Sequence, residues 1–157
     1  KAQAITQSFV GTLLPTLQGA LAAGGPSEAI AVCSERAPQI AADLSTESGW
    51  SVRRVSLKPR NTGIATPDDW ERAMLEDFDR RQQAGEAGAS IRAAGVVDGE
   101  YRFLQAQPTM PLCLTCHGDN LAAEVQSALA EHYPDDMATG YSAGQIRGAI
   151  SLRTSLP

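Results

Sequence analysis

Two cysteines and a histidine constrain this chain more than any other feature. Cys113 and Cys116 are separated by two residues, and His117 follows directly. Two thiols one helical turn apart can form thioethers with the two vinyl groups on one porphyrin edge, and the next side chain then lies under the iron. The run therefore matches the attachment motif for a c-type haem. We expect one haem c per chain, with His117 as an axial ligand of its iron.

Three other interpretations of this run stay open. A structural zinc site needs four ligands, whereas the chain has three cysteines and two histidines, with Cys116 and His117 adjacent. A thioredoxin-like pair lies at a helix N-terminus after a strand, but residues 108–111 read Pro-Thr-Met-Pro, a proline-broken loop. Chance occurrence in a structural role is the third. The spacing favours haem over all of them.

The composition excludes several classes of protein. The chain has 157 residues, 43% of them hydrophobic and 20% charged, so we expect one globular domain over 1–157 rather than a disordered or fibrous chain. The 18 acidic and 13 basic residues give a net charge of −5, with no long basic cluster. This balance argues against nucleic acid or an anionic membrane as a partner. No apolar run approaches the ~20 residues of a membrane span.

The first residue is Lys1 rather than a methionine. We therefore expect a processed product, with a signal peptide or membrane anchor upstream. Attachment of haem to cysteines requires reduced thiols presented outside the cytoplasm. We accordingly expect a bacterial periplasmic protein.

Hydrophobic periodicity predicts an α+β fold. It predicts helices over 3–22, 27–44, from Asp68 up to the Gly85–Gly88 turn, and over 120–132. It predicts strands over 50–57, 91–97, 100–107 and 144–152, the middle two joined by Asp98-Gly99 as a type I′ hairpin. Gly24-Gly25-Pro26 separates the first two helices, and Pro15 is expected to bend or end the first. Cys33 falls on the apolar face of the second helix, so its thiol is expected to point inward.

The second axial position of the iron has several candidate ligands. They are Cys33, Met74, Met110, Met137, His132 and Lys58. Methionines more often fill gaps in a core, a histidine near a helix end is more often partly exposed, and a lysine is usually solvated. Cys33 differs because alanines surround it on its helix and leave room for a flat ring. Its alternative role is that of a small buried hydrophobe.

Four segments resemble, in this order, one family of proteins. They are 29–33 with 37–38, 54–61 leading to 67–71, 113–118, and 133–141 with 144–149. Together they resemble a bacterial and cyanobacterial family of exported c-type haem proteins with a PAS-like fold, long known as a domain of unknown function. That family also occurs as the extracytoplasmic input domain of membrane histidine kinases and chemoreceptors.

The resemblance implies both a fold and a ligand set. It implies an antiparallel sheet of about five strands flanked by helices, with the haem held against it. It also implies that His117 and a cysteine of the N-terminal helical region, here Cys33, are the two iron ligands. The chain departs from the family at Thr62-Gly63-Ile64-Ala65, where the family has proline and asparagine.

The loop before that departure contains Arg60 and Asn61. A guanidinium there can grip a haem propionate with two hydrogen bonds, although an ordinary turn with a solvated arginine is the alternative. Arg54 and Arg147 are weaker candidates for the same role. Residues 133–136 are expected to form a turn near the haem edge. Walls of the haem site are expected from Tyr101, Phe103 and Met110.

A Cys/His ligand pair would fill both axial positions of the iron. An anionic thiolate stabilises Fe(III), so we expect a low reduction potential and an Fe–S bond that weakens on reduction. Such a bond is the bistable element that a switch requires, and CO or NO could enter the vacated position. The first hypothesis is therefore a redox or diatomic-gas sensor working by exchange at Cys33.

Two other functions remain in view. A periplasmic electron carrier would keep both ligands in both oxidation states and would dock a redox partner protein. A helical bundle of the cytochrome c′ type also carries this motif near its C-terminus, but the Asp98-Gly99 hairpin and the 50–57 strand argue against it. An enzyme has the least support, since no Ser/His/Asp or paired-carboxylate arrangement is legible.

Overall fold

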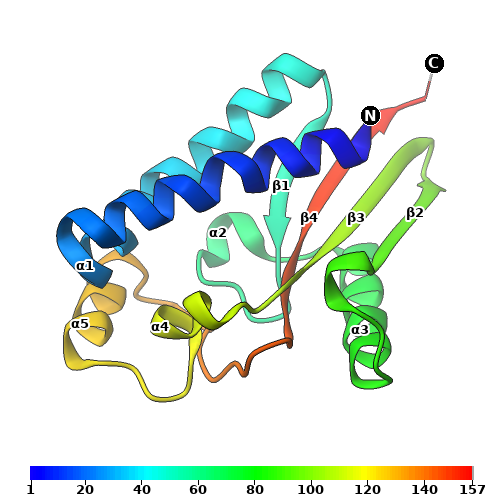
Figure 1. Cartoon of the computed structure of the whole chain (residues 1–157). Helices are drawn as coiled ribbons and strands as arrows, with labels where there is room; N and C mark the ends of the chain where they lie inside the picture. Colours follow the sequence, from blue (N-terminus) through cyan, green and yellow to red (C-terminus); the bar gives the residue numbers. More distant parts are fainter. Residues whose placement is uncertain (157) are drawn as a thin grey trace.

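The computed structural model describes residues 1–156 and shows a four-stranded antiparallel sheet with helices packed on it (Figure 1). The strand order is β1-β4-β3-β2, formed by Ser51–Val55, Ile146–Ser155, Glu100–Pro108 and Arg92–Val97. The α+β class with an antiparallel sheet is therefore confirmed. The four strands are those that the periodicity predicts. The family resemblance implies a fifth strand, but residues 1–156 contain four. The other residues in this range form helices and turns.

The first element, α1 (Ala2–Ser48), folds back on itself at Gly25. Gly25 has φ 72° and ψ −165°, a backbone conformation open essentially only to glycine. The two halves of α1, blue and cyan in Figure 1, lie side by side, and Lys1 Nζ donates to the Ser48 carbonyl at 2.9 Å. The predicted break between two helices is confirmed. Pro15, in contrast, does not end the first half, because α1 continues through it up to the break at Gly25.

The remaining helices are short. They are α2 (Thr62–Ala65), α3 (Asp69–Gln83), α4 (Leu114–His117) and α5 (Ala123–His132), with 3₁₀ turns at Gly88–Ser90 and Pro111–Cys113. Asp68 caps α3: its carboxylate accepts from the Glu71 N–H, and the Glu71 carboxylate accepts from the Asp68 N–H. This capping box satisfies two backbone donors that a helix start leaves free. Within residues 1–156, no helix is long and apolar enough to cross a bilayer.

Both faces of the sheet are buried, each against a different helix. Phe103, Ile150 and Leu152 pack with Ile5 and Phe9 of α1 on one face. On the other face, alternate residues of the same strands pack against α3, in the group Leu104, Ala106, Ala149, Leu75 and Phe78. The period of two along β3 and β4 produces this division.

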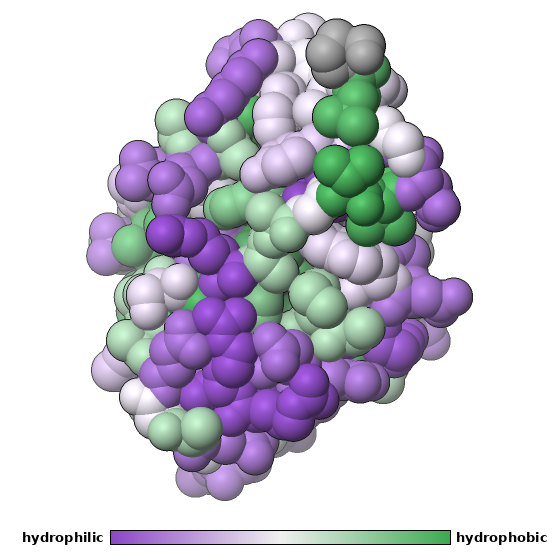
Figure 2. Space-filling view, turned by 90° about the vertical axis from the view of Figure 1, so that its right-hand side faces the viewer, coloured by the Kyte–Doolittle hydropathy of each residue, from purple (hydrophilic) through white to green (hydrophobic). Residues whose placement is uncertain are grey.

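The side of the molecule near the hairpin is mainly hydrophilic (Figure 2). Green atoms gather on it next to the end of the chain, where Val96 and Leu156 are 61% and 45% exposed. The Leu156 N–H donates to the Gly99 carbonyl at 3.4 Å, so the last described residue is tied to the hairpin.

Candidate functional site

A cavity of about 470 Å³ lies between α1, the sheet and α4. This volume is within the range of roughly 300–1,000 Å³ that small-molecule sites occupy. One apolar stripe of α1 serves two purposes: Ile5 and Phe9 enter the core, whereas Leu13, Leu17 and Leu21 line the cavity. The wall is therefore mostly hydrocarbon, as a flat apolar ligand requires.

Every residue to which the sequence assigned cofactor binding lines this cavity. These residues are Cys33, Arg60, Asn61, Cys113, Cys116 and His117. They come from α1, from the loop after β1, and from the segment after β3 that forms the 3₁₀ turn Pro111–Cys113 and α4. The three cysteines are free thiols, each half-buried. The fold thus brings together reactive side chains that lie far apart in the sequence.

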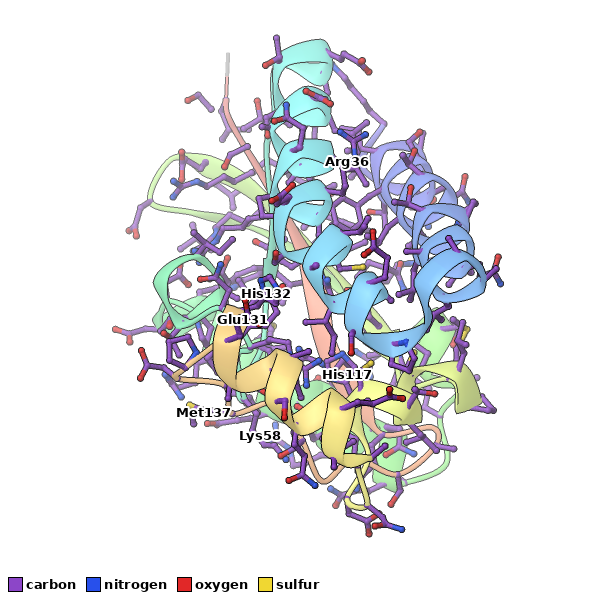
Figure 3. The ribbon with its side chains drawn as sticks, turned by 90° about the vertical axis from the view of Figure 1, so that its left-hand side faces the viewer. Arg36, Lys58, His117, Glu131, His132 and Met137 are labelled. Carbon is purple, nitrogen blue, oxygen red and sulfur yellow. The ribbon has the colours of Figure 1, made fainter. Side chains whose placement is uncertain are left out.

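The other proposed iron ligands are mostly elsewhere. Met74 packs in the core under α3, Met137 is 51% exposed, and His132 is exposed at the end of α5. Lys58 Nζ donates to the Thr139 carbonyl and lies 4.3 Å from the centre of the Tyr141 ring. Figure 3 places His117 between α1 and α5, and Met137 away toward the side of the molecule. Of the proposed ligands, Cys33 and Met110 share the cavity with His117.

The motif is held by a short turn of helix. The Cys113 N–H donates to the Met110 carbonyl at 2.9 Å, and α4 closes where the Gly118 N–H donates to the Leu114 carbonyl at 3.0 Å. A Cβ atom at position 118 would lie 2.7 Å from that carbonyl oxygen. Glycine directly after His117 is therefore a steric requirement of this turn.

The imidazole of His117 has a defined orientation. Its Nδ1 lies 2.8 Å from the Ala138 carbonyl oxygen, and since a carbonyl only accepts, Nδ1 carries the proton. Arg147 Nε lies 3.0 Å from Nδ1 and 3.4 Å from Nε2, so its N–H finds its acceptor in Nε2. Burial, followed by the charges of Arg147 and Arg60, holds the pKa of His117 well below its ordinary value. A neutral ring that keeps its proton on Nδ1 and leaves Nε2 unprotonated is the form that binds metals, and here Nε2 faces the Arg147 guanidinium.

Four arginines line the cavity, and they differ in their partners. Arg53 pairs with Glu71. Arg60 donates from Nε to Asp136 Oδ1 at 3.1 Å and from Nη2 to the carbonyls of Cys116 and Ala138. Arg54 and Arg147 have no carboxylate within ion-pair distance among residues 1–156. Burial lowers the pKa of both, that of Arg147 to about 10. A cavity with two uncompensated cations favours an anionic ligand.

Comparison with known proteins identifies the family. The model of the Tll0287-like family matches residues 1–155. This chain belongs to the Tll0287-like family. A solved structure, the crystal structure of the cyanobacterial haem protein Tll0287, is 23% identical in sequence, with a TM-score of 0.70, and the match covers 99% of this chain and 91% of that one. At this identity the likeness shows the fold. No curated protein matches the chain.

The Tll0287-like chain also departs from expectation at the cavity wall. Met110 lines the cavity, but Tyr101 and Phe103 pack in the core beneath α1. They lie too early in β3, since each strand residue advances the chain about 3.3 Å and it is Gln107 and Pro108 that reach the cavity. Tyr133 contributes an aromatic side chain instead, from the turn after α5.

The sequence favoured Arg60 over Arg54 and Arg147 as the partner of an anionic ligand. In the structure of this Tll0287-like protein, Arg54 and Arg147 are the two cavity arginines without a carboxylate partner among residues 1–156. The signal for Arg147 was present: it is the one charged residue in the otherwise apolar run Ile146–Ile150. Arg60 was predicted to bind an anionic ligand because it lies in a polar loop, but its charge is compensated by an ion pair with Asp136. Which arginine finds a carboxylate depends on contacts between distant segments.

Proposed function

We propose that this cavity holds one haem, attached as haem c through Cys113 and Cys116, and that the protein works as a redox or diatomic-gas sensor. One observation carries the proposal: Cys33 from α1 lines the same cavity as the Cys113–His117 motif. Membership of the Tll0287-like family, in which the solved relative is a haem protein, supports the choice of ligand.

The residues present suit a haem in three respects. The leucines and alanines of α1 offer an apolar wall for the porphyrin. The free thiols of Cys113 and Cys116 lie next to His117, whose Nε2 is unprotonated. Arg54 and Arg147 have no carboxylate partner among residues 1–156, so their charges would suit two propionates. Arg147 already donates to Ser56 Oγ and faces His117.

Bound haem would supply one-electron redox chemistry and an iron that takes small ligands. His117 would be its proximal ligand, fixed in orientation by the Ala138 carbonyl. Cys33 would be the second residue to hold the iron, and the exchangeable one. Cys33 lies in the second half of α1, which packs on α5 through Ile30. If the Cys33 side chain were released from the haem, this half of α1 would be freer to move relative to α5.

Electron transfer is the second candidate, and a feature of the cavity rim favours it. Met110 lines the cavity and is also 40% exposed, so an edge of a bound haem would lie near the surface. A redox protein would then be the partner, whereas the sensor hypothesis makes a diatomic gas or the redox state itself the signal. Both functions are proposed for the bacterial periplasm.

The deciding experiment compares optical spectra of the haem-loaded protein with those of Cys33→Ala. Spectra are recorded oxidised, reduced, and reduced under CO. Met110→Leu is the matched control, because Met110 lines the same cavity. Sensing predicts a low-spin oxidised wild type, CO binding only after reduction, and an altered oxidised spectrum in Cys33→Ala alone.

The opposite result would overturn the sensor hypothesis and support electron transfer. In that case CO would not bind the reduced wild type, and Cys33→Ala would resemble it, so Cys33 would be a core residue. A spectral change in Met110→Leu instead would identify Met110 as the ligand. Failure of the motif cysteines to retain haem would remove both functions.

A further inference from the structure

An ion pair touches the carbonyl group that orients His117. Arg60 and Asp136 form this pair, with side chains 12% and 10% exposed. Asp136 Oδ1 accepts from Arg60 Nε at 3.1 Å and from the Ala138 N–H at 2.8 Å. Arg60 Nη2 donates to the Ala138 carbonyl at 3.0 Å. We call this arrangement the Arg60–Asp136 clamp.

The clamp is part of a continuous contact between two segments. Residues 58–60 lie against residues 137–139: the Met137 N–H donates to the Pro59 carbonyl at 3.1 Å, and Lys58 Nζ donates to the Thr139 carbonyl. Ala138 lies between these two contacts. Its carbonyl is therefore held in place from both sides, which fixes the acceptor that His117 uses.

The Ala138 oxygen accepts two hydrogen bonds at once. One comes from His117 Nδ1–H at 2.8 Å and the other from the cationic Arg60 at 3.0 Å. A charged donor draws electron density from the carbonyl, so the oxygen pulls less strongly on the Nδ1 proton. A weaker pull makes the imidazole a poorer electron donor to a metal on Nε2. Asp136 opposes this effect, because it neutralises part of the charge on Arg60.

We infer that Arg60 and Asp136 are positioning residues that set, through the Ala138 carbonyl, how strongly His117 donates to the iron. The inference rests on the proposed haem ligation by His117. Under this inference, Arg60 has a role other than propionate binding. The reduction potential of the haem then depends on two residues, Arg60 and Asp136, that do not contact the iron.

The first test is the midpoint potential of the haem-loaded protein, measured by spectroelectrochemistry. Arg60→Gln should lower the ratio of ferrous to ferric protein at a fixed potential about tenfold, which is ~59 mV for one electron. Asp136→Asn should shift that ratio in the opposite direction. Arg60→Lys keeps the charge and loses the planar fork, so partial rescue is expected. Arg36→Gln removes an exposed arginine of α1 (Figure 3) and should change nothing.

The second test needs no haem. Nitrogen-15 NMR of the haem-free chain reports the His117 tautomer and the position of the Nδ1 proton resonance. Arg60→Gln should move that resonance downfield, because the Ala138 oxygen then serves His117 alone. Propionate binding by Arg60 cannot produce this change, since no propionate is present.

Each outcome decides the inference. Opposite potential shifts in Arg60→Gln and Asp136→Asn, together with the proton shift, would support it. Shifts of the same sign, or an unmoved Nδ1 resonance, would overturn it. If Arg60→Gln does not fold by circular dichroism, Arg60→Lys and Asp136→Asn carry the test. If the wild type takes up no haem, the proposed function fails, while the NMR arm still shows whether the clamp acts on His117.

Discussion

At the scale of single residues, Arg54 and Arg147 have no carboxylate partner among residues 1–156 and should destabilise the haem-free chain. Burial lowers the pKa of Arg54, which means that the folded chain disfavours its charge. Arg54 is half-buried, and a charge taken partly out of water without a partner costs free energy. Arg54→Met should therefore raise the free energy of unfolding of the haem-free chain by about 1 kcal/mol, measured by urea denaturation.

The same substitution should act oppositely once an anionic ligand is bound. In the haem-loaded protein, Arg54→Met removes a partner of that ligand and should lower stability. Arg72→Met, at an exposed position of α3, is the control and should have little effect in either form. Destabilisation of the haem-free chain by Arg54→Met would show that Arg54 already has a partner there.

At the scale of elements, the fold-back of α1 depends on Gly25. Any other residue at φ 72° and ψ −165° would be strained by about 1–3 kcal/mol. Gly25→Ala should lower the urea midpoint accordingly and loosen the pairing of the two halves of α1. Gly11→Ala is the matched control: the site is exposed and helical with no atom near a new Cβ, so it should stabilise by ~0.5–1 kcal/mol. Equal effects of the two variants would contradict this view of the joint.

The start of α3 should show a pH dependence. Burial would raise the pKa of Asp68, but hydrogen bonds from Arg102 and from the Glu71 N–H outweigh it, so the pKa lies below its ordinary value. Because the folded value is the lower one, the stabilisation is present above the unfolded pKa of about 3.9 and is lost as pH falls through the folded value.

Two substitutions separate the charge of Asp68 from its cap. Asp68→Asn keeps a capping side chain but removes the charge, so it should lower stability near neutrality and flatten the acid limb of stability against pH. Asp68→Ala removes the cap as well and should cost about 1 kcal/mol at pH 7. Thermal melts between pH 3 and pH 7 provide the measurement, and an unchanged acid limb in Asp68→Asn would refute the assignment.

At the scale of the whole molecule, one buried carboxylate joins α3 to three strands. Glu71 is 1% exposed. It pairs with Arg53 of β1 and Arg102 of β3, and it accepts from Ser151 Oγ of β4 at 2.6 Å. Removing one member of a buried ion pair leaves its partners uncompensated. Glu71→Gln should therefore lower the free energy of unfolding by about 3 kcal/mol.

A matched substitution on the same helix tests whether position or charge matters. Glu76 is exposed on α3, so Glu76→Gln removes the same charge and should stay within about 0.5 kcal/mol of wild type. Guanidinium or urea denaturation of both variants gives the comparison. Similar midpoints for the two would mean that Glu71 does not hold the layers together.

Much of this fold could be predicted from short stretches of sequence. Asp98 and Gly99, both at positive φ, form the predicted hairpin, Asp68 caps the predicted helix, and Gly25 separates two helices. The spacing of Cys113, Cys116 and His117 likewise indicated a haem site by itself. Each of these features is decided by atoms within a few residues, so the local sequence contains the whole interaction.

Only the tertiary structure decided which distant residues meet. Cys33 lines the cavity with His117 because α1 folds back over the sheet, whereas Met74 enters a core on the opposite face. Arg60 finds Asp136 and the Ala138 carbonyl, whereas Arg54 and Arg147 find no carboxylate within residues 1–156. The sequence contained all of these side chains, but the partner of a charge or a thiol depends on the packing of segments far apart in the chain, and no local pattern encodes that packing.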